Sequence, residues 1–518
     1  MRTFVDDIRA HAARHPGRVA VTAPDGELTY AELSARIERV ARELRARGAA
    51  AETVCAVAVG PGVDAVVAVA AVVRSGAAFL SLDAGQPPLR LAALARSGGA
   101  QLLLTTSDLA GRLDLPVPGE PVLLDRLEEE RPGADGGDGH SSPPGPFDPE
   151  ALAYVSHTSG STGEPSAVLV GHRGLDSYLR FVVRDYGLGP GTVALQVAPQ
   201  GYDASIRDTF APLLAGGRLV VVPRSALLRP DEFGATVRAH RVTALLSVTP
   251  SFLSFLAGQP DAVKLLEGVR LVVSSGESLR PFLAAGGRSL IRGALVNQYG
   301  PTECTMTSTR YAVPALPDTA DDIVGTPIDG VTVRLLDENL RPVADGTTGE
   351  VFIGGAGVAR GYQGQPARTA ERFVPDPLGP AGARLYRTGD LARRGPHGLV
   401  YLGRTDRQVK IRGYRVDPAE VEGALLAHPR VTGAVVTSGS DDRGRVFLTA
   451  HVTGELAATT DAALRTHLSA TLPPHLMPRR FVRLETLPVT RSGKADRRAL
   501  ADTGTAGSVP AVPTGGPR

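Results

Sequence analysis

Hydrophobic and polar positions in the first 300 residues alternate between two patterns. Segments with helical spacing, such as ELSARIERVARELRARGA (32–49) and DAVVAVAAVVRSG (64–76), are followed by short apolar runs, TVCAVAVG and AFLSLD. Further runs of the second kind are RLVVVP, ALLSVTP and RLVVSSG. Buried parallel strands read as continuous apolar runs, and their crossovers read as helices. The pattern therefore predicts an α/β fold of stacked βα units up to about residue 300.

The pattern changes after residue 300. The segment VTVRLLDENLRPVADGTTGEVFIGG (331–355) alternates in the manner of antiparallel strands, so we expect a β-rich segment there. Residues 131–146, RPGADGGDGHSSPPGP, are rich in Pro, Gly and Ser and predict a surface connection between two structured blocks. The last residues, 501–518, lack periodicity and predict a disordered tail.

Composition narrows the class of protein. A chain of 518 residues is long enough for two or three cores, and 42% hydrophobic with 21% charged residues is a globular composition. A formal net charge of +2 predicts no strong field for nucleic acid, which favours small-molecule partners. Two cysteines, Cys55 and Cys304, exclude a disulfide framework or a cysteine zinc site. Charges interrupt the N-terminus, and no apolar run approaches the length of a membrane span, so we expect a cytoplasmic protein without a membrane anchor.

Lysine is rare in this chain. Lysine and arginine together number 56, but only Lys264, Lys410 and Lys494 are lysines. In such an arginine-rich chain, a lysine either marks a site that needs a compact ammonium group or is retained by chance.

The loop HTSGSTGEPS (157–166) alternates hydroxyls and glycines after the predicted strand ALAYVS. Its backbone N–H groups and hydroxyls could surround phosphate oxygens, although it lacks the Lys-Ser/Thr pair of a P-loop. Taken alone, the loop fits either a nucleotide site or a flexible surface turn.

Four further motifs follow in order: NQYGPTE (297–303), YRTGD (386–390), GRTDRQVKIRGYRVDPAEVE (403–422) and LPVTRSGKADR, which ends at Arg497. With LTYAEL, SGAAFLSLD and GEVFIGGAGVARGYQGQPARTAERF, they make the chain resemble the adenylation domains of nonribosomal peptide synthetases, members of the adenylate-forming superfamily, from about residue 28 to Leu500. The resemblance implies a large N-terminal part of stacked α/β subdomains (1–405) and a small mobile α+β C-terminal lid (406–500). It also implies two-step chemistry, in which ATP and a carboxylic acid form an acyl-adenylate and pyrophosphate, and the acyl group then passes to a carrier-protein thiol.

The resemblance assigns roles to individual residues. Glu303 would be the Mg²⁺ ligand, Tyr299 would lie beside the adenine, and Asp390 would accept the ribose hydroxyls. Lys494 would hold the substrate carboxylate and phosphate during adenylation, Lys410 would approach after the lid rotates, and Asp406 would be the hinge. The expected ATP-binding residues are Thr158, Ser159, Gly160, Ser161, Thr162, Gly163, Tyr299, Thr302, Asp390 and Arg404.

The phosphate loop departs from the family pattern. The family usually continues as Gly-x-Pro-Lys-Gly, whereas this chain has Gly163-Glu164-Pro165-Ser166-Ala167, with serine in place of lysine. Either other groups hold the phosphates, or the first half-reaction is slow. We expect weakened but real catalysis; the alternative is a non-catalytic adenylate-binding protein.

The segment GYDASIRDTF (201–210) resembles the one in which an aspartate holds the substrate's α-ammonium, and Asp203 fits that role. An α-amino acid is therefore expected, because acyl-CoA and aryl-CoA ligases, the other alternative, usually lack this aspartate. The resemblance would line the substrate pocket with Asp203, Ala204, Arg207, Ser247, Val273, Ser275, Gln298, Met306 and Thr307.

Arg207 is the unusual member of this set, because a buried unpaired cation is costly. It either meets an acidic or amide-bearing substrate side chain or turns aside to pair with a neighbour such as Asp208.

Only a short tail follows Leu500, so we expect a free-standing enzyme that uses a separate phosphopantetheinylated carrier protein. A small MbtH-like activator protein is a further partner that the resemblance allows.

Overall fold

The computed structural model describes residues 2–129, 147–160, 164–317, 321–441, 445–456, 459–490 and 495–503. Its contacts divide the chain into two compact units. One contains residues 1–158 and 165–406, and the other contains residues 159–164 and 407–518. The predicted connection at 131–146 lies outside the described residues.

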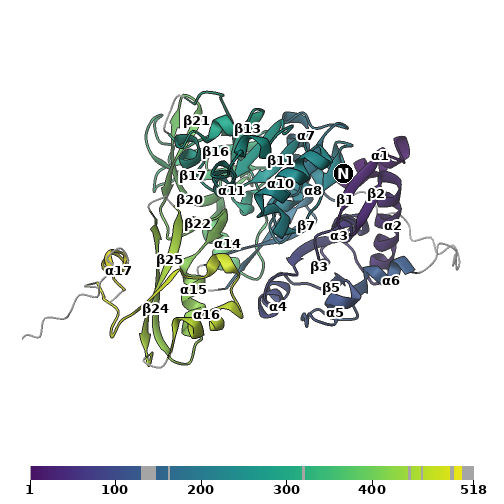
Figure 1. Cartoon of the computed structure of the whole chain (residues 1–518). Helices are drawn as coiled ribbons and strands as arrows, with labels where there is room; N and C mark the ends of the chain where they lie inside the picture. The colour runs from purple at the N-terminus through teal and green to yellow at the C-terminus, as the bar shows by residue number, and fades with distance from the viewer. Residues whose placement is uncertain are drawn as a thin grey trace, which may run out of the picture. The chain divides into compact units, whose positions relative to one another are not determined.

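The first unit contains two large sheets (Figure 1). The order of the fourteen-stranded sheet is β16 (Val331–Leu336), β17 (Gly349–Gly355), β20 (Arg384–Gly395), β21 (Gly398–Arg404), β15 (Ile323–Pro327), β14 (Thr309–Val313), β13 (Ala294–Tyr299), β12 (Leu271–Ser275), β11 (Ala244–Val248), β9 (Val193–Leu195), β10 (Arg218–Val220), β1 (Val19–Ala23) and β2 (Gly26–Thr29), with β19 (Phe373–Pro375) paired to β20. The order of the seven-stranded sheet is β18 (Gly361–Tyr362), β8 (Ser166–Gly171), β7 (Leu152–Thr158), β4 (Ala78–Asp83), β3 (Val54–Val59), β5 (Leu102–Thr105) and β6 (Val122–Leu123).

The helices of this unit are α1 (Phe4–Arg14), α2 (Tyr30–Ala46), α3 (Val63–Ser75), α4 (Pro88–Ser97), α5 (Ser107–Ala110), α6 (Leu124–Glu129), α7 (His172–Asp185), α8 (Ala204–Leu214), α9 (Arg224–Leu227), α10 (Pro230–His240), α11 (Pro250–Ala257), α12 (Ala262–Leu265), α13 (Arg280–Ala284) and α14 (Pro366–Arg372). None of the described helices is both long enough and apolar enough to cross a membrane.

The change of pattern after residue 300 is visible in the fourteen-stranded sheet. Its strands are parallel from β1 through β10, β9, β11 and β12 to β13, and antiparallel from β13 to β16. The sequence pattern predicted both regions because buried parallel strands are continuously apolar, whereas antiparallel strands with one wet face alternate. The predicted α/β fold with a β-rich segment is therefore confirmed.

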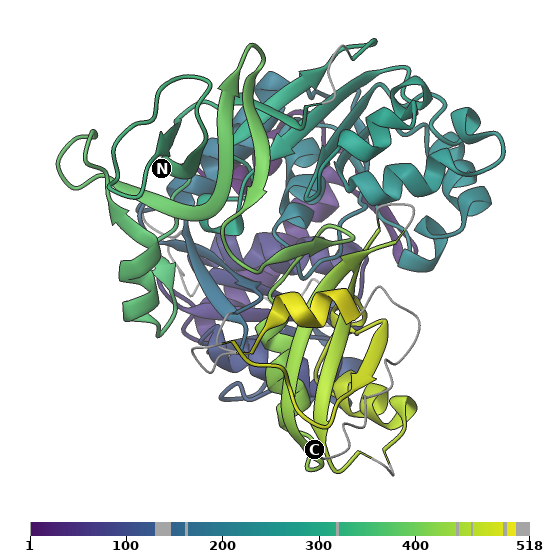
Figure 2. The same ribbon diagram turned by 90° about the vertical axis from the view of Figure 1, so that its left-hand side faces the viewer.

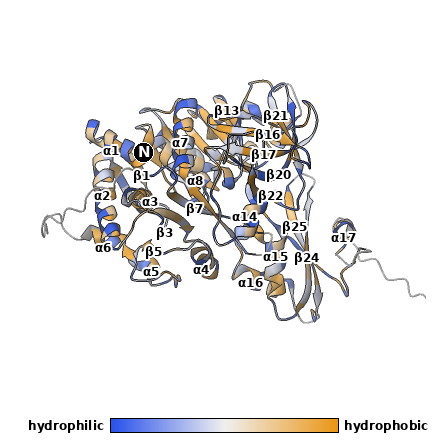
Figure 3. Cartoon of the chain, turned by 180° about the vertical axis from the view of Figure 1, so that it is seen from behind, coloured by the Kyte–Doolittle hydropathy of each residue, from blue (hydrophilic) through white to orange (hydrophobic). Residues whose placement is uncertain are grey.

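Helix α3 explains the longest apolar run in the chain. It packs on β3 and β4 of one sheet and on β1 and β2 of the other, so every residue except Asp64 is buried. A helix covered on all sides needs no polar face. Figure 3 accordingly shows predominantly hydrophobic colours along α3 and β3.

The second unit is a small α+β domain. Its elements are β22 (Val409–Ile411), β23 (Tyr414–Val416), α15 (Pro418–Leu426), β24 (Val431–Ser440), β25 (Val446–Gly454), α16 (Asp461–Ser469), β26 (Arg480–Arg483) and α17 (Arg497–Thr503). The long antiparallel pair β24–β25, yellow-green in Figure 2, carries a core of its own with α15 and α16.

The predicted start of the disordered tail is wrong by a few residues. Residues 501–503 belong to α17. Arg497 Nη1 and Nη2 donate to the two oxygens of Glu422 at 2.7 and 3.0 Å, and Leu500 is buried. These contacts stabilise α17. The sequence did not indicate them, because the residues after Leu500 show no helical periodicity.

Candidate functional site

Asp203 precedes α8, at the position where the helix begins. Its Oδ2 atom is shielded from solvent and accepts no hydrogen bond from any described residue. Burial raises the pKa of this carboxyl group, and a hydrogen bond from the Thr302 side chain opposes that rise. A desolvated carboxylate with one oxygen uncommitted is suited to a cationic ligand group.

Arg207, one helical turn further on, is 1% exposed. Its Nε donates to Ser247 Oγ at 3.0 Å, and its Nη2 donates to Ser275 Oγ at 3.3 Å. Its Nη1 donates to Tyr178 OH at 2.8 Å and to Gln298 Oε1. All of these acceptors are neutral, so the guanidinium is hydrogen-bonded but has no carboxylate in direct contact within the described part of the chain.

Asp208, which one sequence-based alternative paired with Arg207, makes no direct ion pair with it, although the two buried charges attract each other through space. Its Oδ2 accepts hydrogen bonds from the backbone N–H groups of Val197 and Ala198, both at 2.9 Å. The Arg207 guanidinium points toward Tyr178, Ser247 and Gln298, and not toward the Asp208 carboxylate.

The structure brings together most of the expected pocket residues. Ser247 Oγ donates to the Ala204 carbonyl at 2.9 Å, and Thr307 Oγ1 donates to Gln298 Oε1 at 3.1 Å. Of the expected pocket residues, those in hydrogen-bonded contact with Arg207 or with its partners are Ala204, Ser247, Ser275, Gln298 and Thr307, which we call the Arg207 cluster together with Arg207. Val273 and Met306 are buried members of the main hydrophobic core, and their place in the pocket stays a prediction.

Two members of the site were missed by sequence reasoning. Tyr178 OH accepts from Arg207, and Tyr186 OH accepts from the Gln298 side-chain amide. Both tyrosines come from the α7 region, which packs on α8. No motif flagged them, because their role depends on helix packing and not on a local pattern.

The backbone at Gly300 lies close to the backbone at Thr307 and Ser308, and this approach positions Thr307 in the Arg207 cluster. A Cβ atom at Gly300 would lie 2.6 Å from Thr307 Cα and 2.6 Å from Ser308 N. Only glycine fits there, and the tight return of the chain sets Thr307 beside Gln298.

Consecutive residues of β13 serve two different sites, because side chains alternate across a strand. Gln298 faces the Arg207 cluster, whereas Tyr299 OH donates to Asp390 Oδ2 at 2.6 Å. Burial, followed by the nearby Asp390 carboxylate, raises the pKa of Tyr299, so its hydroxyl stays protonated and acts as the donor.

Arg404 joins Asp390 to the last residue of the first unit. The two residues are paired across β20 and β21, and Arg404 Nη1 donates to Asp390 Oδ1. The same guanidinium donates to Asp406 Oδ1 from Nε at 2.7 Å and to Oδ2 from Nη2 at 2.8 Å. The expected ribose-binding and hinge residues are thus held by one bidentate arginine.

Glu303 lies in a short 3-10 helix, Thr302–Cys304, and is completely buried. Its Oε1 accepts from Tyr362 OH at 2.8 Å, and Tyr362 OH is 3.3 Å from Tyr386 OH. No group of three or more metal-ligating side chains occurs among the residues that the structure describes. A single carboxylate fits Mg²⁺, which is commonly held by one or two carboxylates together with substrate phosphates.

The phosphate loop is described only in part. Thr158 ends β7, and its Oγ1 is buried and makes no hydrogen bond to a described residue. Ser159 Oγ donates to the Arg415 carbonyl at 2.8 Å and accepts from Asp417 N at 3.0 Å. Gly160 follows without regular structure, whereas Ser161, Thr162 and Gly163 lie outside the described residues.

Of the two lysines to which the sequence assigns roles, the structure describes only one. Lys410 lies in β22, opposite Arg415 of β23. Lys494 lies outside the described residues, so its role stays a prediction.

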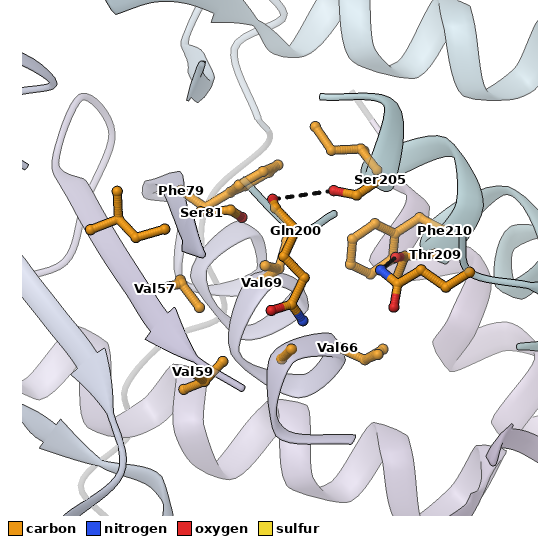
Figure 4. Close-up of a pocket in the computed structure, with 14 residues that line it drawn as sticks. Val57, Val59, Val66, Val69, Phe79, Ser81, Gln200, Ser205, Thr209 and Phe210 are labelled. Atoms are coloured by element: carbon orange, nitrogen blue, oxygen red, sulfur yellow. Dashed lines mark hydrogen bonds between the residues drawn. The ribbon is translucent and has the colours of Figure 1, made fainter. Parts of the chain in front are cut away.

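A small cavity of about 30 Å³ lies on the other side of α8 (Figure 4). Ser205, Thr209 and Phe210 face it, and at 3.6 residues per turn Ser205 and Thr209 lie on the side of the helix opposite Arg207. Its remaining lining is mostly aliphatic, and its size admits about one water molecule. It is therefore separate from the polar cluster and too small for a substrate.

Comparisons with known proteins agree with this geometry. The profile of the AMP-binding enzyme family matches residues 8–363, and that of the AMP-binding enzyme C-terminal domain matches residues 420–494. The chain is 41% identical over 513 residues to phosphinothricin tripeptide synthetase PhsC of Streptomyces viridochromogenes, covering 97% of this chain and 45% of that protein. It is 34% identical over 512 residues to a dimodular nonribosomal peptide synthase of Bacillus subtilis, covering 96% of this chain and 21% of that protein.

The chain thus spans less than half the length of these relatives. Among solved structures, an artificially fused adenylation and PCP di-domain from Klebsiella oxytoca, NpsA-ThdA, is 25% identical with a TM-score of 0.80, covering 94% of both chains.

Proposed function

The chain belongs to the AMP-binding enzyme family, among the adenylation domains of the nonribosomal peptide synthetase type, and from this premise we propose that it activates a polar α-amino acid. The observation that carries the proposal is Asp203, a desolvated carboxylate with an uncommitted oxygen beside the Arg207 cluster. The α-ammonium of the substrate would bind Asp203, and its side chain would extend toward Arg207. An acidic or amide-bearing side chain would supply the acceptor that a buried guanidinium prefers.

The reaction follows from the family. One oxygen of the amino-acid carboxylate attacks the α-phosphorus of ATP, the bridging bond to the β-phosphate breaks, and pyrophosphate leaves with the electron pair. Glu303 would hold Mg²⁺, which neutralises charge on the phosphate oxygens when bound. Asp390 has about four acceptor sites, so it can accept ribose hydroxyls while Tyr299 and Arg404 stay bonded to it.

The second step would use the small unit. Lys494 would serve adenylation and Lys410 thioester formation, with Asp406 as the hinge between the two arrangements. The acceptor would be the phosphopantetheine thiol of a separate carrier protein, and its sulfur would displace AMP while releasing its proton. Solved relatives that combine adenylation and PCP domains support this partner. A small MbtH-like activator protein is a further proposed partner.

An ATP–pyrophosphate exchange assay across the proteinogenic amino acids tests the proposal. We expect exchange that depends on one polar, acidic or amide-bearing amino acid, and loading of carrier protein but not of free CoA. Exchange with acyl or aryl acids and transfer to CoA would indicate a CoA ligase instead. Absence of exchange with retained ATP binding would indicate an adenylate-binding protein.

A further inference from the structure

Ser166 is the position at which the phosphate loop lacks its lysine, and the structure places another cation there. Ser166 is completely buried at the start of β8. Its Oγ accepts a hydrogen bond from Arg368 Nη1, and lies 3.4 Å from Gln365 Oε1. Arg368 comes from α14, 202 residues later in the chain.

The Arg368 guanidinium also lies over an aromatic ring of the site. Its central carbon is 4.7 Å from the centre of the Tyr362 ring, and the hydroxyl of the same tyrosine donates to Glu303 Oε1 at 2.8 Å. Tyr362 therefore links the cation to the carboxylate proposed to hold Mg²⁺. Stacking on a tyrosine and a single hydroxyl contact orient a guanidinium without neutralising it.

Arg368 forms no ion pair with any carboxylate that the structure describes. None of the carboxylates in the described ranges lies within ion-pair distance of it, and its Nε and Nη2 donate to no described residue. The other arginines of this region differ: Arg360 pairs with Glu52, and Arg387 pairs with Glu350. A guanidinium with two donor nitrogens uncommitted, stacked on a tyrosine whose hydroxyl binds a buried carboxylate, is suited to bidentate binding of a phosphate.

We propose that Arg368 binds the β- and γ-phosphates of ATP and supplies, from α14, the positive charge that the loop lacks at Ser166. This inference rests on the proposed adenylation reaction. Negative charge accumulates on pyrophosphate as its bond to the α-phosphorus breaks, and a fixed guanidinium stabilises that charge. Ser166 is then an adaptation rather than a defect, because a lysine at the same point would crowd and repel Arg368.

The test compares wild type with Arg368→Gln, Arg368→Lys, Ser166→Lys, and the double variant Arg368→Leu with Ser166→Lys. Arg112→Gln is the matched control, since Arg112 forms an exposed ion pair with Asp108. Calorimetry in Mg²⁺ buffer measures binding of ATP, inorganic pyrophosphate and AMP, and exchange kinetics measure kcat/KM for ATP.

We expect Arg368→Gln to lower kcat/KM for ATP by about 10²-fold and to weaken ATP and pyrophosphate binding, while AMP binding stays within about twofold. Arg368→Lys should show a smaller loss, the double variant should recover most of the activity, and Ser166→Lys alone should bring no gain. Unchanged pyrophosphate affinity in Arg368→Gln overturns the inference. So does an equal loss for ATP, pyrophosphate and AMP, which would show that Arg368 only supports the fold of the site.

Two further outcomes separate this inference from the proposed function. If Arg368→Gln does not fold, Arg368→Lys and the double variant still decide the matter, because a lack of rescue by the Ser166→Lys change would refute a charge role. If wild type binds ATP but exchanges with no amino acid, the proposed function fails, whereas selective loss of pyrophosphate binding in Arg368→Gln would still support the phosphate contact.

Discussion

Replacing Arg207 by alanine tests how the substrate side chain is selected. In wild type the guanidinium donates to Ser247, Tyr178, Gln298 and Ser275. Its Nη2 makes the longest of these contacts, 3.3 Å to Ser275, so a substrate acceptor would bind at that nitrogen. Truncation removes this donor and leaves the substrate carboxylate or amide desolvated without its partner.

The expected loss follows from the burial of the contact. Removing one partner of a buried charge-assisted pair costs about 2 to 5 kcal/mol. At 1.36 kcal/mol per factor of ten, this corresponds to about 30-fold to about 5,000-fold in specificity. Water entering the vacated space would reduce the effect, so we expect at least about a tenfold loss.

The assay is exchange kinetics with Asp, Glu, Asn, Gln, Ser and Ala, and its readout is the ratio of kcat/KM for the preferred amino acid to that for Ala. A ratio cancels any change in the amount of folded enzyme, which matters because Arg207 also holds neighbouring side chains together. Ser205→Ala is the matched control, since Ser205 lies on the face of α8 that lines the separate cavity. This control should keep the wild-type ranking.

Two results would refute the reasoning. Wild type could prefer a large apolar amino acid, which has no acceptor for the guanidinium. Alternatively, Arg207→Ala could keep the wild-type ranking, which would mean that Arg207 only braces Tyr178 and Gln298.

Asp203→Asn should abolish amino-acid-dependent exchange yet raise the melting temperature of the free protein. Burial raises the pKa of Asp203 in the folded protein above its unfolded value. The stabilising contribution of the protonated carboxyl group is therefore present below the unfolded pKa and is lost as the pH rises through the folded-state pKa, so the ionised form lowers the stability at pH 7. A lower melting temperature of Asp203→Asn would contradict this. The KM for the amino acid in wild type should rise as the pH falls toward that raised pKa, since protonated Asp203 cannot pair with an ammonium, and a flat profile would remove Asp203 from the site. Lys494→Ala should slow exchange by about 10²-fold or more, whereas Lys410→Ala should leave exchange nearly intact and slow carrier loading. Equal losses in exchange and loading assays would exclude separate roles for the two lysines.

Much of the candidate site was predictable because its residues occur in short contiguous motifs. Asp203, Ala204 and Arg207 lie within one helical turn, and Gln298, Tyr299, Thr302 and Glu303 lie within one strand and the turn after it. Local spacing therefore fixes which side chains can meet, since side chains follow the periods of helix and strand. The sequence could not decide which groups accept the hydrogen bonds of Arg207, because the acceptors around it come from separate elements.

The class of fold and the identity of the chemical groups follow from the amino-acid sequence, because both depend on local periods and contiguous motifs. Contacts between distant segments depend on the tertiary structure. Tyr178 joins the site because α7 packs on α8, and Arg368 reaches Ser166 because β18 pairs with β8 just before α14 begins. In the sequence, Ser166 in place of the family's lysine indicates that the phosphate loop has lost a positive charge. In the fold a cation from 202 residues away contacts that serine, since burial and packing bring together positions that no local pattern connects.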